Sequence, residues 1–253
     1  MKHFILLLST FLCAITLNAC HKQRDPKKEN IDGDGWITPY LFDAIVKIGD
    51  LELKPNNNNG YQLGIPDRTA LLLMLSGKVY YWHGEEHKEE FKRLAEKIGD
   101  LPKKEGYEHA TPVDNITTEA PISSIEIKAL SSYDAEHPEG SSLKDIIRIR
   151  YTSFDHVFDP TIDTNYDPSI GVSHYQRGYS IEPEVGFNPI KHPALRGGGF
   201  SGKEGLFKKG LTMSIEFTKD PIFPRQKIQV SLSFGNGLTL KKEIDIDIIR
   251  LKN

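Results

Sequence analysis

The chain lacks the compositional features of several specialised classes of protein. Its 253 residues contain only two cysteines and two tryptophans, and 32 Lys and Arg residues are balanced by 35 Asp and Glu residues. Because nucleic acid attracts proteins that carry an excess of positive charge, this balance argues against a nucleic-acid partner. The 21 glycines and 15 prolines are too few for a collagen-like or low-complexity chain. The composition is that of an ordinary globular protein.

Long apolar runs are also scarce. The longest lies at 4–16, and after it no apolar run exceeds the six residues 70–75. A membrane-spanning helix needs about 20 consecutive apolar residues. The sequence therefore predicts no membrane-spanning helix in the body of the protein.

The first 20 residues have the pattern of a secretory signal. Lys2 and His3 supply a basic start, 4–16 an apolar stretch, and 17–20 a cleavage site with small residues. Cys13 would be removed with 1–19, which leaves Cys20 as the one thiol of the mature chain. Such a thiol has no partner for a disulfide within its own chain.

The cleavage site Leu17-Asn18-Ala19-Cys20 resembles the lipobox of bacterial lipoproteins, although Asn18 differs from the small or hydroxyl residue usual at its position. The resemblance implies cleavage before Cys20, a diacylglycerol thioether on its sulfur and an acylated amino terminus. Two or three acyl chains anchor a protein firmly, whereas one chain binds only marginally. The resemblance thus implies a cell-envelope protein that this lipid attaches to the membrane, with the outer membrane as the expected one. The alternative is a plain secretory signal with an incidental Cys20.

Residues 20–35 are predicted to form the lipidated end and a flexible tether. Between 21 and 30 the chain has five basic residues and no aliphatic ones, a composition typical of solvated linkers. Some surface-displayed lipoproteins carry an acidic run at this place. The basic run of this chain therefore favours a location facing the periplasm over surface display.

A mixed α/β segment is expected at 36–112. Four apolar residues recur at the i, i+3, i+4 and i+7 spacing of one helix face: Phe91, Leu94, Ala95 and Ile98. They predict a surface helix over 85–98 that ends before Gly99, with an ion pair between Glu89 and Arg93 on its outer face. The apolar run at 67–75 fits either a buried helix or a buried strand.

The remaining residues, 113–253, predict a β-sandwich. Apolar and polar residues alternate at 147–151, 211–217, 228–234, 238–240 and 244–248, and Asn236-Gly237 predicts a tight hairpin turn. The fold class is therefore mainly β: a C-terminal antiparallel β-sandwich, immunoglobulin-like or related, beside a smaller N-terminal α/β segment. Residues 36–253 fold either as these two parts or as one domain.

One short motif suggests zinc. His83-Gly84-Glu85-Glu86-His87 matches the H-x-x-E-H pattern of inverted zinc proteases, in which two histidines bind zinc and the acidic residue activates water. Gly84 and the acidic pair also fit a solvated helix start, which places His83 before the helix and outside ligand geometry. The second interpretation is the better one.

A second motif suggests calcium. Asn30, Asp32 and Asp34 occupy positions 1, 3 and 5 of an EF-hand-type loop, but Leu41 replaces the acidic residue that position 12 requires. A weak calcium site is one interpretation. The other, which we favour, is a Gly/Asp turn where the chain leaves the tether.

The long irregular stretch at 155–210 is the best candidate for ligand binding. Its side chains suited to recognition include Asp155, Tyr166, Tyr175 and Tyr179. Long loops on a rigid scaffold commonly carry recognition, although aromatic residues in ordinary loops also cover the ends of a core.

The sequence therefore predicts a lipid-anchored envelope protein that binds or assembles without catalysis, with a glycan or an envelope protein as its partner. No G-x-S-x-G motif is present, and an acylated Cys20 leaves no cysteine nucleophile. An extracytoplasmic hydrolase is the alternative, metal-dependent if His83, Glu86 and His87 converge.

Overall fold

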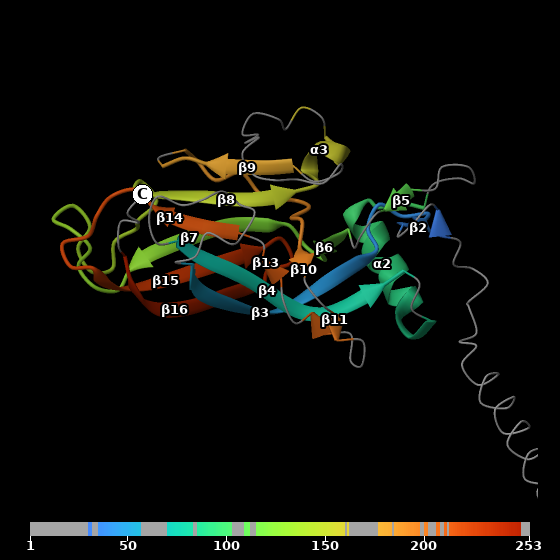
Figure 1. Cartoon of the computed structure of the whole chain (residues 1–253), viewed down its shortest axis with the longest axis horizontal. Coiled ribbons are helices and arrows are strands. Elements are labelled where there is room, and N and C mark those ends of the chain that lie inside the picture. The colour runs from blue at the N-terminus through green and yellow to red at the C-terminus, as the bar shows by residue number, and fades with distance from the viewer. Residues whose placement is uncertain are drawn as a thin grey trace, which may run out of the picture.

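The computed structural model in Figure 1 is mainly β. The structure describes residues 30–31, 35–56, 70–82, 85–102, 109–111, 115–159, 161, 177–183, 185–197, 200–201, 206–207, 210–211 and 213–248. Two sheets packed face to face make a β-sandwich-like body, which confirms the predicted fold class. No helix among these residues is both long and apolar enough to cross a membrane.

The larger sheet has eight strands. They are β3 (Ala44–Asn56), β4 (Ala70–Tyr81), β6 (Ile116–Thr118), β8 (Ile147–Ser153), β9 (Arg177–Ile181), β11 (Phe200–Ser201), β12 (Leu206–Phe207) and β14 (Met213–Phe217). The order is β11-β12-β4-β14-β8-β9, and β3 pairs with the whole length of β4 and with β6. The run at 67–75 therefore contributes to a buried strand and not to a helix.

The smaller sheet has three strands, β7 (Ile122–Ala129), β15 (Arg225–Phe234) and β16 (Thr239–Asp247), with β15 in the middle. Asn236 and Gly237 form the predicted turn between β15 and β16, and Gly237 has a φ of 86°, which glycine adopts without strain. Two short ribbons complete the strands: β1 (Asn30–Ile31), β2 (Gly35–Thr38) and β5 (His109–Thr111), then β10 (Arg196–Gly197) and β13 (Gly210–Leu211).

The core lies between the two sheets and is built from alternate residues of their strands. Ile228, Val230 and Leu232 of β15 belong to the same buried cluster as Leu71 and Leu73 of β4. Each of these side chains is fully buried, so each adds apolar area to the favourable free energy of folding. The alternation read from the sequence thus indicates which face of each strand is buried.

The final strands of the chain divide between the sheets. β14 pairs with β4 and β8 in the larger sheet, whereas β15 pairs with β16 and β7 in the smaller one. The pairing of β14 with β4 also joins the expected N-terminal segment to the expected sandwich within one sheet.

A helix covers one end of the β3–β4 hairpin. A single turn of 3-10 helix, Glu85–His87, precedes α2 (Lys88–Ile98), and Gly99 ends it with a φ of 83°. The buried face packs on β3 and β4 through three residues of the helix and three others: Phe91, Leu94 and Ala95 with Tyr40, Ile45 and Tyr80. This confirms the predicted helix and its apolar face.

The ion pairs on the outer face of α2 differ from the expected one. Arg93 pairs with Glu90 at 2.7 Å, and Glu89 pairs with Lys92 at 2.8 Å. The expected pair of Glu89 with Arg93 is therefore wrong, because each acidic residue finds a basic residue one position nearer, at i,i+3.

Candidate functional site

Two loops lie side by side at the end of the sandwich opposite α2 (Figure 1). One connects β7 to β8 over 130–146, and the other connects β14 to β15 over 218–224. We call them the long loop and the tip loop. Hydrogen bonds between them, described below, show that they form one surface.

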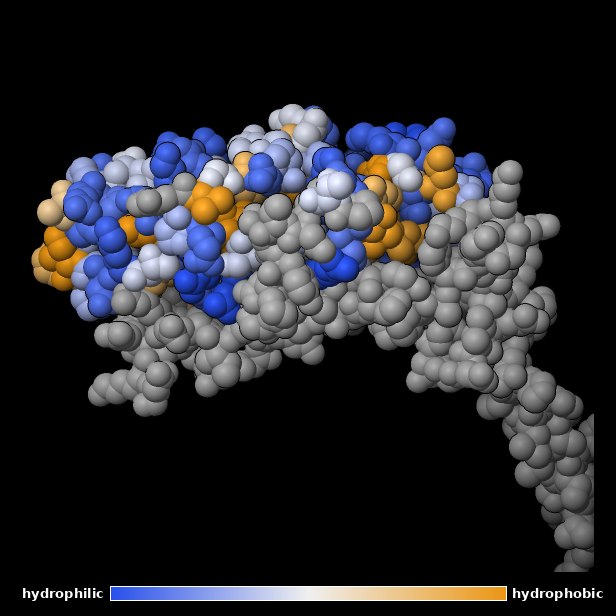
Figure 2. Space-filling view, turned by 90° about the horizontal axis from the view of Figure 1, so that it is seen from above, coloured by the Kyte–Doolittle hydropathy of each residue, from blue (hydrophilic) through white to orange (hydrophobic). Residues whose placement is uncertain are grey.

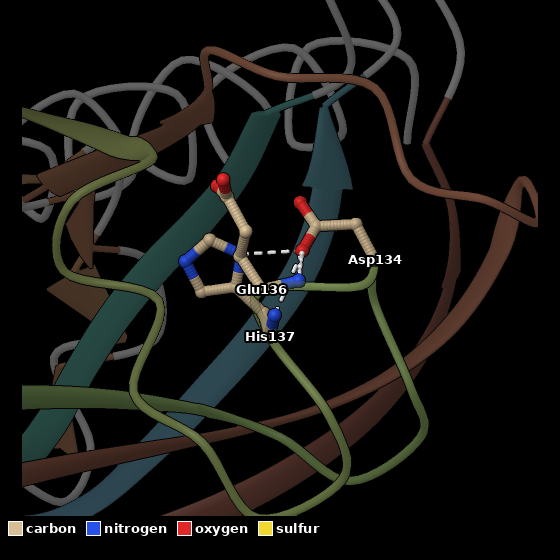
Figure 3. Close-up of side chains that lie close together, drawn as sticks. All are labelled: Asp134, Glu136 and His137. Carbon is tan, nitrogen blue, oxygen red and sulfur yellow. Dashed lines mark hydrogen bonds and ion pairs between the residues drawn. The ribbon is translucent and has the colours of Figure 1, made fainter.

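A buried histidine organises the long loop (Figure 3). His137 is 4% exposed, and both of its ring nitrogens face carboxylates: Nδ1 lies 2.7 Å from Asp134 Oδ1, and Nε2 lies 3.0 Å from Asp145. Asp134 Oδ1 also accepts hydrogen bonds from the backbone N–H groups of Glu136 and His137, each at 2.8 Å. The histidine thus joins two carboxylates that are eleven positions apart in the chain.

This environment favours the imidazolium form of His137. Burial opposes its charge, but the hydrogen bonds to Asp134 and Asp145 and the two negative charges outweigh burial, so the pKa of His137 is raised. Burial likewise raises the pKa of Asp134, yet its hydrogen bonds to His137 and to the backbone prevail and lower it. We call the group formed by Asp134, His137 and Asp145 the clasp, and its histidine stays protonated to higher pH than an ordinary histidine does.

The clasp is a poor site for a metal ion. One ligand atom each of Asp134, Glu136 and His137 lies within 4.8 Å of the others, as a metal would require. Both imidazole nitrogens are already hydrogen-bonded to carboxylates, however, and Glu136 pairs with Lys219 at 3.2 Å. Because a metal needs an unprotonated imidazole nitrogen, binding would break the clasp, and we assign no metal here.

Tyr133 connects the clasp to the tip loop. Its backbone N–H donates to the carbonyl of His137 at 2.9 Å, and its own carbonyl accepts from the N–H of Ile222 at 2.8 Å. Its hydroxyl donates to the carbonyl of Lys219 at 2.6 Å, while its fully buried ring stacks near Phe217. One core residue therefore holds the tip loop at two points, through its backbone carbonyl and its hydroxyl.

The tip loop exposes two large apolar side chains. Ile222 is 57% exposed and Phe223 is 68% exposed, between Pro221 and Pro224. The Phe223 carbonyl accepts a hydrogen bond of 2.7 Å from the side-chain amide of Gln226, which fixes the far side of the loop. Figure 2 shows hydrophobic atoms gathered at this end among hydrophilic ones. An apolar pair that is held in place yet open to water is typical of a contact surface.

The expected binding residues of 155–210 lie elsewhere. Asp155 begins the short helix α3 (Asp155–Phe158) and is 5% exposed. Its carboxylate accepts hydrogen bonds from the backbone N–H groups of Lys191 and His192 at 3.1 and 2.6 Å and contacts the His192 ring at 3.1 Å. Since His192 Nε2 in turn lies 3.1 Å from the carbonyl of Ile98, Asp155 takes part in an internal tie to the end of α2.

Tyr179 lies in β9 and is 2% exposed, with its ring stacked on Tyr151 at 5.4 Å between centroids. The structure places it in the core. Tyr166 and Tyr175 lie outside the described residues. Ligand binding by these residues stays a prediction.

The described residues include only part of the remaining predicted sites. Cys20, His83, Asp32 and Asp34 lie outside the described residues, whereas Asn30 pairs with Trp36 between β1 and β2. The zinc and calcium hypotheses therefore stay untested.

The other members of the zinc motif lie at the start of the α2 region. The side chain of Glu86 is 89% exposed, and the ring of His87 meets Tyr80 edge-on at 5.4 Å. This is the solvated helix start that the sequence favours.

The loop end itself was not singled out by the sequence. From the sequence, the long loop is only a polar connection between two strands. The one available signal for the tip loop was an apolar pair, Ile222 and Phe223, between two prolines and outside any alternating strand pattern.

Comparisons of the chain with family models, with curated proteins and with solved structures found no match. The geometry of the site therefore carries the functional argument.

Proposed function

We propose that this protein is a lipid-anchored, non-catalytic binding component of the bacterial cell envelope, and that it contacts another envelope protein through the tip loop. Cys20 would carry the lipid, and the chain that follows it would lead to the paired strands β1 and β2. In Figure 1, β2 and α2 lie at one end of the body and the tip loop at the other. The anchored end and the contact surface would then be well separated, as a component that joins the membrane to a partner requires.

The observation that carries the proposal is the exposure of Ile222 and Phe223 on a constrained loop. Leaving two large apolar side chains in water forgoes roughly 1.5–3 kcal/mol of burial free energy for each. Binding by a loop that is already ordered loses little conformational entropy. The pair thus has the features of an anchor that inserts into an apolar pocket on a partner.

A protein fits this surface better than a glycan does. The exposed pair combines an aliphatic and an aromatic side chain, and charged residues of both signs surround it, including Lys219, Asp220 and Arg225. An apolar centre with a polar rim is the usual anatomy of a protein interface. Glycan binding relies more on several polar groups around an aromatic face.

Site-specific photo-crosslinking in the cells that make the protein tests the contact. With benzoylphenylalanine in place of Phe223, we expect one discrete crosslinked envelope protein, and Ile222→Ser in the same chain should reduce its yield. The control places the same crosslinker at Glu96, an exposed polar position of α2 at the opposite end of the body. An equal yield of the same product from both positions, or no product from position 223, contradicts the proposal.

The anchor is tested separately by mass spectrometry of the mature chain. Lipidation predicts an amino-terminal peptide that begins at Cys20 and carries the mass of its acyl chains. The Cys20→Ser variant should lose both the added mass and membrane association. An unmodified Cys20 in a membrane-free protein rules out the lipid anchor.

A further inference from the structure

The loop end contains a titratable group that the contact surface itself does not use. His137 is buried beneath the long loop and is separated from the tip loop by a single residue in the hydrogen-bonded path, Tyr133. The path runs from His137 through its carbonyl to the N–H of Tyr133, and from the carbonyl of Tyr133 to the N–H of Ile222. Glu136, the neighbour of His137, adds a second link through its ion pair with Lys219.

We propose that the protonated His137 clasp is a pH-dependent lock that holds the tip loop in its binding conformation and releases it when the imidazolium loses its proton. This inference rests on the proposed function of the tip loop as a contact surface. Tyr133 connects the clasp to the tip loop at Lys219 and at Ile222, and the ion pair of Glu136 with Lys219 supports the same connection.

The charged groups around His137 decide the direction of the effect. Asp134 and Asp145 face its ring directly, Glu136 is adjacent in the chain, and the ring of Tyr133 meets it edge-on at 6.4 Å. Lys219 of the tip loop is the nearby cation and is paired with Glu136. A neutral imidazole keeps one N–H. Its other nitrogen would then point a lone pair at a lone pair of the facing carboxylate oxygen, and that hydrogen bond would be lost.

Deprotonation therefore breaks one side of the clasp. Because the pKa of His137 is raised above the ordinary value for histidine, the lock is complete below about pH 6.5 and opens as the pH rises through the raised pKa. Asp134 has a lowered pKa and stays ionised until strongly acidic pH. The tip loop should thus be ordered over a range of pH whose upper limit is the pH at which His137 loses its proton.

Hydrogen exchange of the full chain in detergent, measured by mass spectrometry from pH 6 to pH 9, tests the lock. Proline has no N–H, so the deuterium that overlapping longer peptides assign to 221–224 by difference belongs to the amides of Ile222 and Phe223. After correction for the intrinsic rate, we expect protection of this pair to fall by about tenfold across the range. Protection in β15 should stay constant, which shows that the sandwich remains folded.

Two variants of the clasp and one control variant separate the lock from general pH effects. In His137→Gln, protection of the tip loop should be low and independent of pH, whereas His87→Gln, at the opposite end of the molecule, should behave like the wild type. Asp145→Asn removes one carboxylate from the clasp and should move the midpoint of the transition to lower pH. This second variant keeps the test decisive if His137→Gln does not fold.

Any of three results overturns the lock: protection of the tip loop in the wild type that does not change with pH, a fall in protection that persists in His137→Gln, or an unchanged midpoint in Asp145→Asn. The measurement uses the protein without any partner. Its failure would leave the crosslinking test of the proposed function intact, and a failed crosslinking test would leave an observed pH transition in place.

Discussion

Replacing Gly77 by alanine should weaken the whole sandwich. Gly77 lies in β4 opposite Ile48, where β3 carries a bulge at Gly49. A Cβ added at Gly77 would lie 1.9 Å from the carbonyl oxygen of Lys47 and 2.8 Å from its carbonyl carbon. In real proteins a Cβ essentially never lies closer than 3.0 Å to such a nonbonded atom. The new Cβ and the Lys47 oxygen must therefore move apart by at least 1.1 Å (3.0 minus 1.9).

The cost of this separation follows from what surrounds it. β3 and β4 pair with each other along their whole length, so the bulge cannot open without disturbing ladder hydrogen bonds next to it. Overpacking a core costs about 1–3 kcal/mol, and each lost hydrogen bond adds about 1 kcal/mol. We therefore expect Gly77→Ala to lower the free energy of unfolding by about 3 kcal/mol or more.

Urea unfolding followed by circular dichroism measures this change, and Gly49→Ala is the matched control. Gly49 belongs to the same bulge, but a Cβ there would meet nothing closer than 3.9 Å, and its φ lies outside the left-handed region. Its replacement should cost less than about 1 kcal/mol. Equal unfolding midpoints for the two variants would refute the close approach as the reason for glycine at position 77.

Three further predictions concern the helix and the loop end. Phe91→Ala should lower the free energy of unfolding by about 3 kcal/mol, because a fully buried ring in edge contact with Tyr40 anchors α2. Urea unfolding measures this change, and an unchanged midpoint would contradict the packing of Phe91 in the core. Tyr133→Phe should cost about 1 kcal/mol through loss of its 2.6 Å hydrogen bond to Lys219, measured by thermal and urea unfolding, with little change expected if that bond is absent. The stabilising effect of His137 should be complete below about pH 6.5 and decline as the pH rises through its raised folded-state pKa. Unfolding of the wild type and of His137→Gln at several pH values measures this effect as a difference in the free energy of unfolding. A difference that grows with rising pH would contradict the prediction.

The elements of this fold follow from local physical chemistry and could be read from the sequence. The alternation at 228–234 marks β15 because successive side chains of a strand point to opposite faces, and one face is buried. Asn236-Gly237 specifies a turn because glycine tolerates a positive φ. The spacing of Phe91 and Leu94 marks the buried face of α2 for a similar geometric reason.

Sheet membership depended on tertiary structure. β14 looks like the partner of the strands that follow it, yet it pairs with β4 and β8, and the run at 67–75 has no period that would distinguish strand from helix. The choice depends on which neighbours complete the backbone hydrogen bonds of each strand. Local sequence does not contain that information.

The loop end shows the same division most clearly. The sequence alone determined the alternating strands at 211–217 and 228–234 on either side of the tip loop, and it contained the patterns of an export signal and a lipidated Cys20, which remain predictions. Only the tertiary structure brought Tyr133 to Ile222 and Lys219, across 86 positions in the case of Lys219, and placed His137 between two carboxylates. A hydrogen bond depends on the positions of atoms in space, and the two sheets that carry these loops fix those positions together.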